Sequence, residues 1–497
     1  MSASARQYDE RPEPTPRPAL AREEPATQKL PLMTLAAMVV GSMVGAGVFS
    51  LPRNFAQATG VYGALIAWAI AGLGMLMLAF VFQTLAVRKP DLDAGVYAYA
   101  KAGFGAYPGF FSAFGYWASA CVGNVTYWVL IKSTLGAALP AFGEGNTVLA
   151  VALSSVGVWA FHFLILRGVK QAAGINKLVT IAKIIPLLVF LAIAAFAFKA
   201  DVFRGNLWGG PDRTVGALFG QVKSTMLITV FVFLGIEGAT VYSRYAKRRE
   251  DVGTATVLGF LGVLALFVLV TILSYGVLPK AELEQLRQPS VAGVLQSIVG
   301  TWGLVFISVG VIVSVLGAYL AWTLMAAEVA YMAAKSDDLP AFLKRTNPQQ
   351  VPAAALLMTT LLIQLVLLVT LFSDDAFTFT LKLCSALNLV PYVFAAGYAL
   401  KLGMTRETYE GEPAARRRQT LVAFIATAYT VFMLFAAGIK FLLLSFIIYA
   451  PGTILFFMAR REQGKRVFSP VEMGVFVVAV IGAIAGVVAL AQGWITI

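Results

Sequence analysis

Residues 35–52 read LAAMVVGSMVGAGVFSLP, and this run decides the fold that we predict. It is apolar enough to lie in a membrane, yet Gly41, Gly45 and Gly47 crowd its centre and Pro52 follows. Glycine is costly inside a helix because it loses more backbone freedom on ordering than any other residue. The run therefore predicts a membrane helix that is interrupted near its middle.

A second run, ITVFVFLGIEGATVYS over 228–243, repeats this pattern with Gly235 and Gly238 on either side of Glu237. Two interruptions five spans apart predict an inverted five-plus-five repeat whose first and sixth helices are discontinuous. The alternative explanation is close helix packing through small residues. Three glycines in seven positions of the first run are more than such packing needs.

The composition indicates an all-α membrane protein. Apolar residues make up 59% of the 497 residues, charged residues only 13%, and the mean hydropathy is +0.80. Soluble domains are nearer half apolar and a quarter charged. Cys121 and Cys384 lie far apart in apolar stretches, and His162 is the single histidine. We therefore expect no disulfide framework, metal site or cofactor. The net charge of +13 is divided among short loops, which indicates membrane topology rather than nucleic-acid binding.

The apolar runs predict about thirteen transmembrane helices, because each span needs about 20 apolar residues. Residues 1–29 mix Arg with acidic residues and proline, and predict a disordered cytoplasmic tail rather than a signal peptide. We assign 30–402 to a ten-helix transport core and 403–497 to three additional helices. The predicted spans are 31–56, 61–86, 106–137, 147–166, 175–198, 216–243, 253–278, 294–334, 352–372, 376–402, 419–438, 440–459 and 470–493. The eighth of these is too long for one span and is expected to project beyond the bilayer.

The basic residues orient these spans. With the N-terminus and every second loop on one side, that side holds 27 of the 38 Lys and Arg residues. Such a bias marks the cytoplasmic face. We therefore predict a cytoplasmic N-terminus and a periplasmic C-terminus in a bacterial inner membrane. The opposite side holds Arg53, Lys132, Lys199, Arg204, Arg213, Lys280, Arg287 and Lys440.

The interrupted helices predict a binding site for an α-amino acid. Unwinding at Gly45–Gly47 exposes backbone N–H groups at the start of a half-helix, which suits a carboxylate. Freed carbonyl groups on the first half, and on the sixth span, can accept hydrogen bonds from an ammonium group. Inserting a carboxylate such as that of Glu237 at mid-membrane costs about 2.5–3.5 kcal/mol of free energy on insertion scales, so Glu237 should face a cavity or a partner.

Four motifs carry a family resemblance: GSMVGAGVFSLPRNFA (41–56), RKPDLDAGVYAYAKAGFG (88–105), FLGIEGATVYSRYAKRREDVG (233–253) and AWTLMAAEVAYMAAKSDDLP (321–340). Together they resemble the amino acid–polyamine–organocation superfamily. Within it they are similar to the basic amino acid/polyamine antiporters, and most similar to bacterial arginine/ornithine antiporters. The resemblance runs from about residue 30 to the C-terminus.

The resemblance implies roles for residues of the first, sixth and eighth spans. Gly45, Ala46 and Gly47 match the turn that holds the substrate carboxylate, with Ala46 replacing a serine of the relatives. The carbonyl of Val44 matches one that meets the α-amino group. The remaining substrate contacts implied on spans 6 and 8 are Phe231, where the relatives have a tryptophan stacked on the guanidinium, Leu234, Glu237 and Trp322.

Several further polar residues lie within the spans. Glu237 either couples to the bound cation and gates transport or is a hydrogen-bonded packing residue. Lys183 matches a lysine that replaces a sodium ion in proton-coupled relatives and would bridge to the first span; otherwise it snorkels to the cytoplasmic face. Glu328 either faces the transport route or pairs with a lysine, and Lys382 has no assigned role. Asn124, Ser385 and Asn388 either line the cavity or bond helices together.

We therefore expect a secondary transporter that exchanges cationic amino acids by alternating access, with arginine against ornithine as the leading pair and lysine as a third substrate. A proton-coupled lysine or arginine symporter is the alternative. Neither a channel filter nor a catalytic cluster stands out, so we expect neither a channel nor an enzyme. The resemblance implies a monomer or homodimer, embedded in the lipid bilayer.

Overall fold

The structure is a computed structural model that describes residues 32–92, 96–168, 173–237 and 249–497. The predicted tail over 1–29 and Gly238 lie outside the described residues. The helices of the described part are α1 (Leu32–Met43), α2 (Leu51–Ala58), α3 (Val61–Arg88), α4 (Val96–Phe104), α5 (Ala106–Gly136), α6 (Val148–Leu166), α7 (Ala173–Phe196), α8 (Ala200–Gly205), α9 (Val215–Phe233), α11 (Arg249–Val277), α12 (Lys280–Gln285), α13 (Ser290–Val299), α14 (Thr301–Lys335), α15 (Ala353–Val369), α16 (Ala376–Thr405), α17 (Pro413–Glu462) and α18 (Pro470–Ala491). Short 3₁₀ turns are η1 (Ala46–Ser50), η2 (Pro140–Phe142), η4 (Ala341–Lys344) and η5 (Thr370–Phe372).

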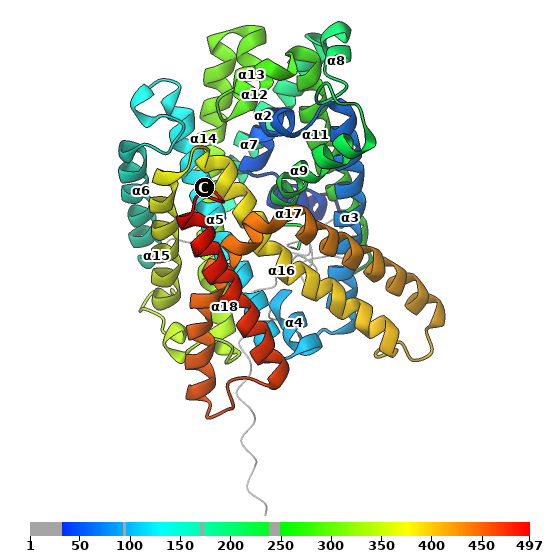
Figure 1. The fold of residues 1–497 in the computed structure, drawn as a ribbon, viewed down its shortest axis with the longest axis vertical. Coiled ribbons are helices and arrows are strands. Elements are labelled where there is room, and N and C mark those ends of the chain that lie inside the picture. The colour runs from blue at the N-terminus through cyan, green and yellow to red at the C-terminus, as the bar shows by residue number, and fades with distance from the viewer. Residues whose placement is uncertain (1–31, 93–95, 169–172, 238–248) are drawn as a thin grey trace, which may run out of the picture.

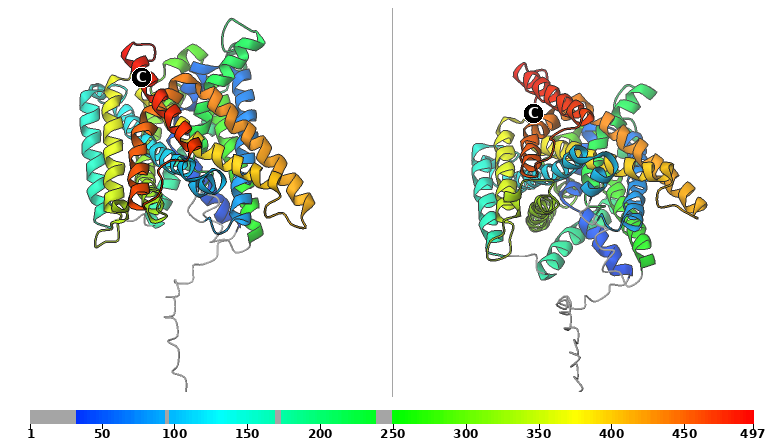
Figure 2. Two further views of the ribbon diagram at one scale, coloured as in Figure 1. Left: turned by 60° about the horizontal axis from the view of Figure 1, so that its bottom comes forward. Right: turned by 90° about the horizontal axis from the view of Figure 1, so that it is seen from below.

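The long helices pack into one bundle whose centre is α5 (Figure 1). Almost every residue of α5 is buried, and this helix contacts α14, α15 and α16. The short helices α8, α12 and α13 lie together at one end of the bundle, and α4 lies at the opposite end (Figures 1 and 2). The breaks in the first and sixth spans lie between these two ends.

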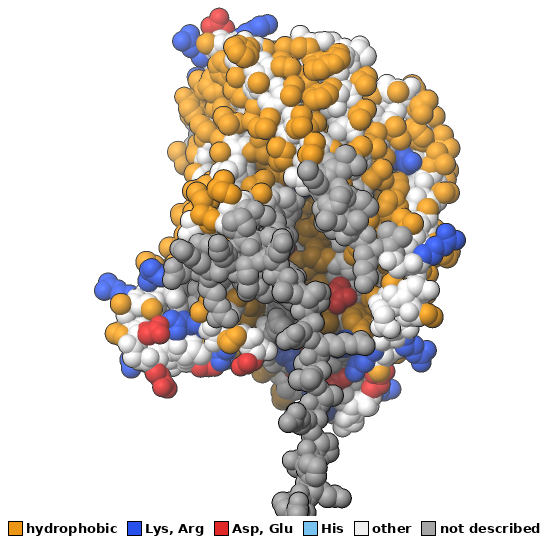
Figure 3. Space-filling view, turned by 180° about the vertical axis from the view of Figure 1, so that it is seen from behind, with side chains coloured by type: hydrophobic (Ala, Val, Ile, Leu, Met, Phe, Trp, Pro, Cys, Tyr) orange, Lys and Arg blue, Asp and Glu red, His pale blue; other side chains and the backbone are white. Residues whose placement is uncertain are grey.

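Ten helices of the described residues are long and apolar enough to cross a membrane, and the bent pair of α1 and α2 makes eleven. Large apolar side chains cover their outer surfaces. Phe196 is 94% exposed and Val215 is 85% exposed. Figure 3 shows these apolar side chains as a broad band, with charged side chains gathered mainly toward the ends. Because such a surface would aggregate in water, it marks contact with lipid, and the chain is a multi-pass membrane protein.

Glycines divide two long apolar segments of the chain. The expected span over 294–334 is wrong as a single helix, because Gly300 separates α13 from α14 with a φ of 73°. A positive φ is strained for residues with a side chain and ends the regular helix there. Likewise, Gly438 has a φ of 72° and interrupts the 50 residues of α17, where the sequence predicts two spans.

Candidate functional site

The first span is broken at its predicted position. After α1 ends at Met43, Val44 and Gly45 leave the helix, and η1 leads into α2 at an angle of 51° to α1. No side chain caps η1 at Gly45. The first N–H groups of a helix have no partner within it. The Val44 N–H group still donates to the Val40 carbonyl at 2.9 Å, so the donors that this turn can offer are those of Gly45–Gly47. Val44 and Ala46 are buried there.

The predicted sixth span leaves its helix as well, and its residues beyond Glu237 lie outside the described part of the chain. After α9 ends at Phe233, Leu234 leaves the helix with a ψ of 138°, and Gly235 has a φ of 99°. Ser42 Oγ donates to the Val39 carbonyl within α1 at 2.8 Å and shares this hydrogen with the Gly235 carbonyl at 3.2 Å. A Cβ atom on Gly235 would lie 2.6 Å from the Ser42 carbonyl oxygen, which is closer than Cβ atoms approach such a group. The two breaks are therefore in direct contact, and Gly235 is required for that contact.

Gly47 and Phe231 form a second contact between the breaks. A Cβ atom on Gly47 would lie 2.9 Å from Phe231 Cδ1 and 2.7 Å from Val232 Cγ1. Phe231 is only 7% exposed, and its ring lies against the turn that the sequence assigns to the carboxylate. The hydroxyl of Tyr127 on α5 lies 3.8 Å from the Cβ position of Gly45. Sequence reasoning missed Tyr127, which faces the turn where Ala46 lacks a hydroxyl.

Glu237 is held by two tyrosines. Tyr116 on α5 donates to Glu237 Oε1 at 2.7 Å, and Tyr392 on α16 donates to Glu237 Oε2 at 2.7 Å. The N–H group of Gly235 donates to Oε2 at 3.2 Å. The carboxyl group is buried and connects α5 and α16 to the break after α9. The expected partner for a buried carboxylate therefore exists, and the two tyrosines that provide it were not predicted.

Lys183 on α7 lies beside the first break. Its ammonium donates to the Gly41 carbonyl at 2.5 Å, and the residue is 7% exposed. Gly41 belongs to the last turn of α1, where carbonyl groups lose their helical partners. The predicted bridge to the first span is present, and the side chain does not snorkel to a surface. A role for Lys183 in coupling remains a prediction.

The other predicted residues lie around α5, α14 and α16. Asn124 Nδ2 donates to Thr323 Oγ1 at 3.1 Å, and among the described residues its buried Oδ1 has no partner. Trp322, next to Thr323, is partly buried. Ser385 Oγ donates to the Leu227 carbonyl on α9 at 2.7 Å, so it bonds two helices together.

Three predicted polar residues differ in their surroundings. Asn388 is buried, and within the described part of the chain its Nδ2 makes no hydrogen bond. Glu328 is exposed on α14. Lys382 is partly buried at a cavity between α2, α9 and α16. Of the predicted residues, Phe231, Glu237 and Lys183 therefore contact the breaks.

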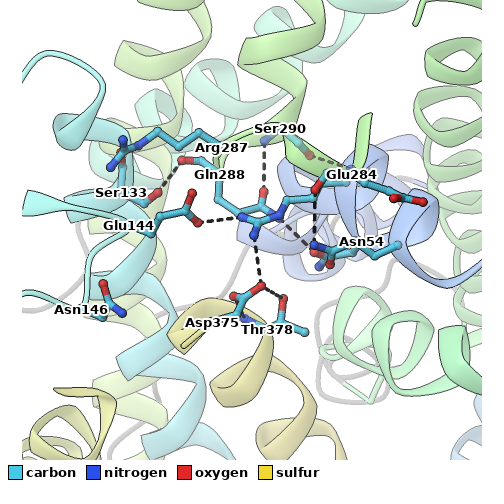
Figure 4. Close-up of polar contacts among 12 residues, drawn as sticks. Asn54, Ser133, Glu144, Asn146, Glu284, Arg287, Gln288, Ser290, Asp375 and Thr378 are labelled. Atoms are coloured by element: carbon cyan, nitrogen blue, oxygen red, sulfur yellow. Dashed lines mark hydrogen bonds and ion pairs between the residues drawn. The ribbon is translucent and has the colours of Figure 1, made fainter. Parts of the chain in front are cut away.

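A polar network around Arg53, the Arg53 network, lies at the end of the bundle near α12 and α13. Arg53 of α2 forms ion pairs with Glu144 at 2.7 Å and Asp375 at 3.4 Å. Its backbone N–H donates to Ser290 Oγ at 3.1 Å, and Gln288 Nε2 donates to Asn54 Oδ1 at 3.0 Å. Figure 4 shows Glu144, Asp375 and Gln288 converging from three segments of the chain.

The sequence of residues 30–459 matches the family model described as amino acid permease. The chain belongs to the amino acid permease family. This permease is 50% identical to an arginine/ornithine antiporter of Pseudomonas aeruginosa over 95% of this chain and 99% of that protein. It is 40% identical to an L-lysine transport protein of Corynebacterium glutamicum over 93% of this chain and 95% of that protein. It is 38% identical to an arginine/ornithine antiporter of Latilactobacillus sakei over 96% of this chain and 100% of that protein.

Membership confirms the resemblance that the four motifs carry, and the expectation that this permease is a transporter rather than an enzyme. The interrupted runs that predict an amino acid site thus belong to an amino acid permease. Tyr116, Tyr127 and Tyr392, which the sequence did not mark, are three of its 17 tyrosines. The one available signal was the mid-membrane Glu237, since a buried carboxylate requires donors.

Proposed function

We propose that this permease exchanges arginine for ornithine by alternating access, with the substrate bound where the breaks of the first and sixth spans meet. The contact between Ser42 and Gly235 supports this proposal, because it brings the turn after α1 and the turn after α9 to one place. N–H groups of the first turn and carbonyl groups of both turns would complement the carboxylate and the ammonium of an α-amino acid.

The turn over Gly45–Gly47 would hold the carboxylate through backbone N–H groups. The hydroxyl of Tyr127 lies near Gly45 and would donate the hydrogen bond for which Ala46 has no group. The carbonyl groups of Val44 and Leu234 would accept from the α-amino group. These groups recognise the part that arginine, ornithine and lysine have in common, so they set the requirement for an α-amino acid.

The cationic side chain would extend toward Phe231 and Trp322. A guanidinium or ammonium group over an aromatic face gains about 0.5–2 kcal/mol, more where water is excluded. The Oδ1 of Asn124, which has no partner among the described residues, lies on α5 near Thr323, next to Trp322, and would accept one of the guanidinium donors. The aromatic rings would favour a positively charged substrate side chain, and the amide oxygen would favour hydrogen-bond donors at the tip of that side chain.

Two polar connections would act as the gates. The Arg53 network joins α2 to the loop before α6 and to the start of α16, on the proposed outer side. Glu237 joins the break after α9 to α5 and α16 through Tyr116 and Tyr392. To open the outer side, the ion pairs of Arg53 would have to break. To open the inner side, the hydrogen bonds of Glu237 would have to break. A vacant site would leave buried donors and acceptors unpaired, which opposes reorientation without substrate and favours strict exchange.

The predicted thirteen spans and inverted repeat are consistent with this geometry. Besides the ten or eleven apolar spans, the buried α5 has 31 residues, which is about 46 Å of helix. The 50 residues of α17 would extend about 75 Å if straight, far more than a bilayer core of about 30 Å. The break at Gly438 divides α17 into two spans. We infer a core of spans 1–5 and 6–10 followed by three additional helices.

We infer a cytoplasmic N-terminus and a periplasmic C-terminus in the inner membrane, from the bias of basic residues. The Arg53 network then lies on the periplasmic side, and α4 with Lys101 lies on the cytoplasmic side. We expect a monomer or a homodimer.

The substrate pair follows from the relatives. Arginine and ornithine each carry one net positive charge, so their one-for-one exchange moves no net charge and is driven by their gradients alone. Proteoliposomes loaded with ornithine should take up labelled arginine, and empty ones should not. Equal uptake by both would contradict exchange.

A proton-coupled symporter is the second candidate. The burial of the Lys183 ammonium against Gly41 favours it, since a fixed cation beside the first break can take the place of a coupling ion. The similarity to an L-lysine transport protein agrees with this alternative. A symporter would accumulate lysine or arginine in empty vesicles under an inward proton gradient, whereas an exchanger would not.

A further inference from the structure

A cavity of about 260 Å³ lies between α2, α9 and α16, beside the Arg53 network. Its mouth is at Gln57 and Ser224, which are exposed. Its floor is formed by Asn54 and Ile228, which are 2% and 1% exposed. The cavity therefore extends from exposed to buried residues, on the side of the breaks that we assign to the periplasm.

The ammonium group of Lys382 is the single charged group in the lining of this cavity. Within the described residues it forms no hydrogen bond and no ion pair. The nearest carboxylate on its helix, that of Asp375, is already engaged by Arg53 at 3.4 Å and by the backbone and hydroxyl of Thr378 at 2.9 and 3.0 Å. Asp375 still attracts the Lys382 ammonium electrostatically, and the ammonium of Lys440 repels it. Because Lys382 shares this carboxylate with Arg53, it can attract a further anion that enters the cavity.

The cavity leads toward the breaks. Ile228 in its floor precedes Phe231 by three residues, which is about one turn of α9. Lys382 precedes Ser385 by the same spacing on α16. A molecule that passes from the periplasm to the turn over Gly45–Gly47 would therefore meet Lys382 about one helical turn earlier.

We propose that this cavity is an outer subsite for the carboxylate of the incoming amino acid, and that Lys382 is a specificity-determining residue against amines without a carboxylate. The inference rests on the proposed exchange of cationic amino acids. Arginine brings a carboxylate that neutralises Lys382. Agmatine, which is arginine without its carboxylate, brings two positive charges and meets a like charge, which is repulsive at short range.

The test compares Lys382→Met and Lys382→Arg with the unmodified permease in right-side-out vesicles loaded with ornithine. Lys382→Met should raise the external KM for arginine about tenfold, the effect of losing one charge-assisted hydrogen bond. External agmatine should become a stronger competitor of arginine uptake. Lys382→Arg should keep the external KM for arginine and the weak competition by agmatine of the unmodified protein. Lys223→Met is the matched control, because Lys223 lies on α9 over the Phe435 ring and does not line the cavity.

Sidedness separates a subsite from a structural role. A subsite at the periplasmic mouth affects the external KM and leaves the internal KM for ornithine unchanged, whereas general damage changes both. Should Lys382→Met fail to fold, Lys382→Gln gives the same comparison with a polar side chain. Unchanged arginine-over-agmatine preference in a folded neutral variant would overturn this inference. Absence of ornithine-dependent arginine uptake by the unmodified permease would instead overturn the proposed exchange.

Discussion

Ser42 and Gly235 join the two broken spans: the Ser42 hydroxyl donates to the Gly235 carbonyl at 3.2 Å, and the Gly235 backbone lies too close to Ser42 for a side chain to fit. They are 193 residues apart in the sequence. The contact holds two unwound turns against each other inside the bundle, where their backbone groups can serve a ligand.

Gly235→Ala should abolish exchange and lower stability. The φ of 99° and the 2.6 Å approach to the Ser42 carbonyl both oppose a Cβ atom, and such strain costs about 1–3 kcal/mol. Uptake of labelled arginine and the thermal unfolding temperature in detergent measure the two effects. Gly220→Ala on α9 is the control, since nothing lies within 4 Å of its Cβ position. Normal uptake by Gly235→Ala would contradict the required close contact.

Tyr392→Phe should slow exchange about tenfold or more while leaving arginine binding nearly intact. The substitution removes one of two tyrosine donors to Glu237, and a hydrogen bond to a charged group contributes about 1.5–3 kcal/mol. Glu237→Gln should give a similar loss of rate. Tyr449→Phe, which removes a hydroxyl bonded to the Leu387 carbonyl, should leave the rate unchanged. The rate of counterflow and the Kd for arginine distinguish gating from binding.

Lys183→Met should leave the Gly41 carbonyl without its donor and weaken the junction of α7 with the first break. An unpaired buried acceptor costs about 1–3 kcal/mol, so exchange should fall about tenfold. Counterflow in proteoliposomes at several external pH values measures this. Lys183→Arg keeps a donor and should retain part of the activity. An unaltered rate in Lys183→Met would show that the bridge has no part in transport.

Arg53→Gln should loosen the outer closure. The substitution removes ion pairs to Glu144 and Asp375, so α2 should separate more often from the loop before α6 and from α16. An Ile228→Cys reporter at the cavity floor, in a protein without Cys121 and Cys384, should then react faster with an impermeant maleimide. Arg88→Gln disrupts an ion pair to Glu412 elsewhere in the bundle and should leave the labelling rate unchanged.

The breaks were predictable because glycine clusters inside apolar runs have a local cause. Gly41, Gly45 and Gly47 act through their own backbone freedom, so no distant residue is needed to interpret them. A lone glycine is less informative, and the break at Gly300 was missed because one glycine in an apolar run is equally compatible with helix packing.

The partners of the site residues were not predictable from local patterns. Tyr116 lies 121 residues before Glu237, and Tyr392 lies 155 residues after it. Their meeting depends on how α5 and α16 pack against α9, which no periodicity specifies. The ion pairs of Arg53 also depend on helix packing and were not predictable, although the charge of Arg53 and its place after the first break are visible in the sequence.

A structure of the permease with bound L-arginine would show whether the two breaks form the substrate site. We predict the carboxylate of arginine within hydrogen-bonding distance of the Gly45–Gly47 N–H groups, and its guanidinium beside Phe231 and Trp322. Arginine bound elsewhere, with the two breaks in contact and no ligand between their backbone groups, would contradict it.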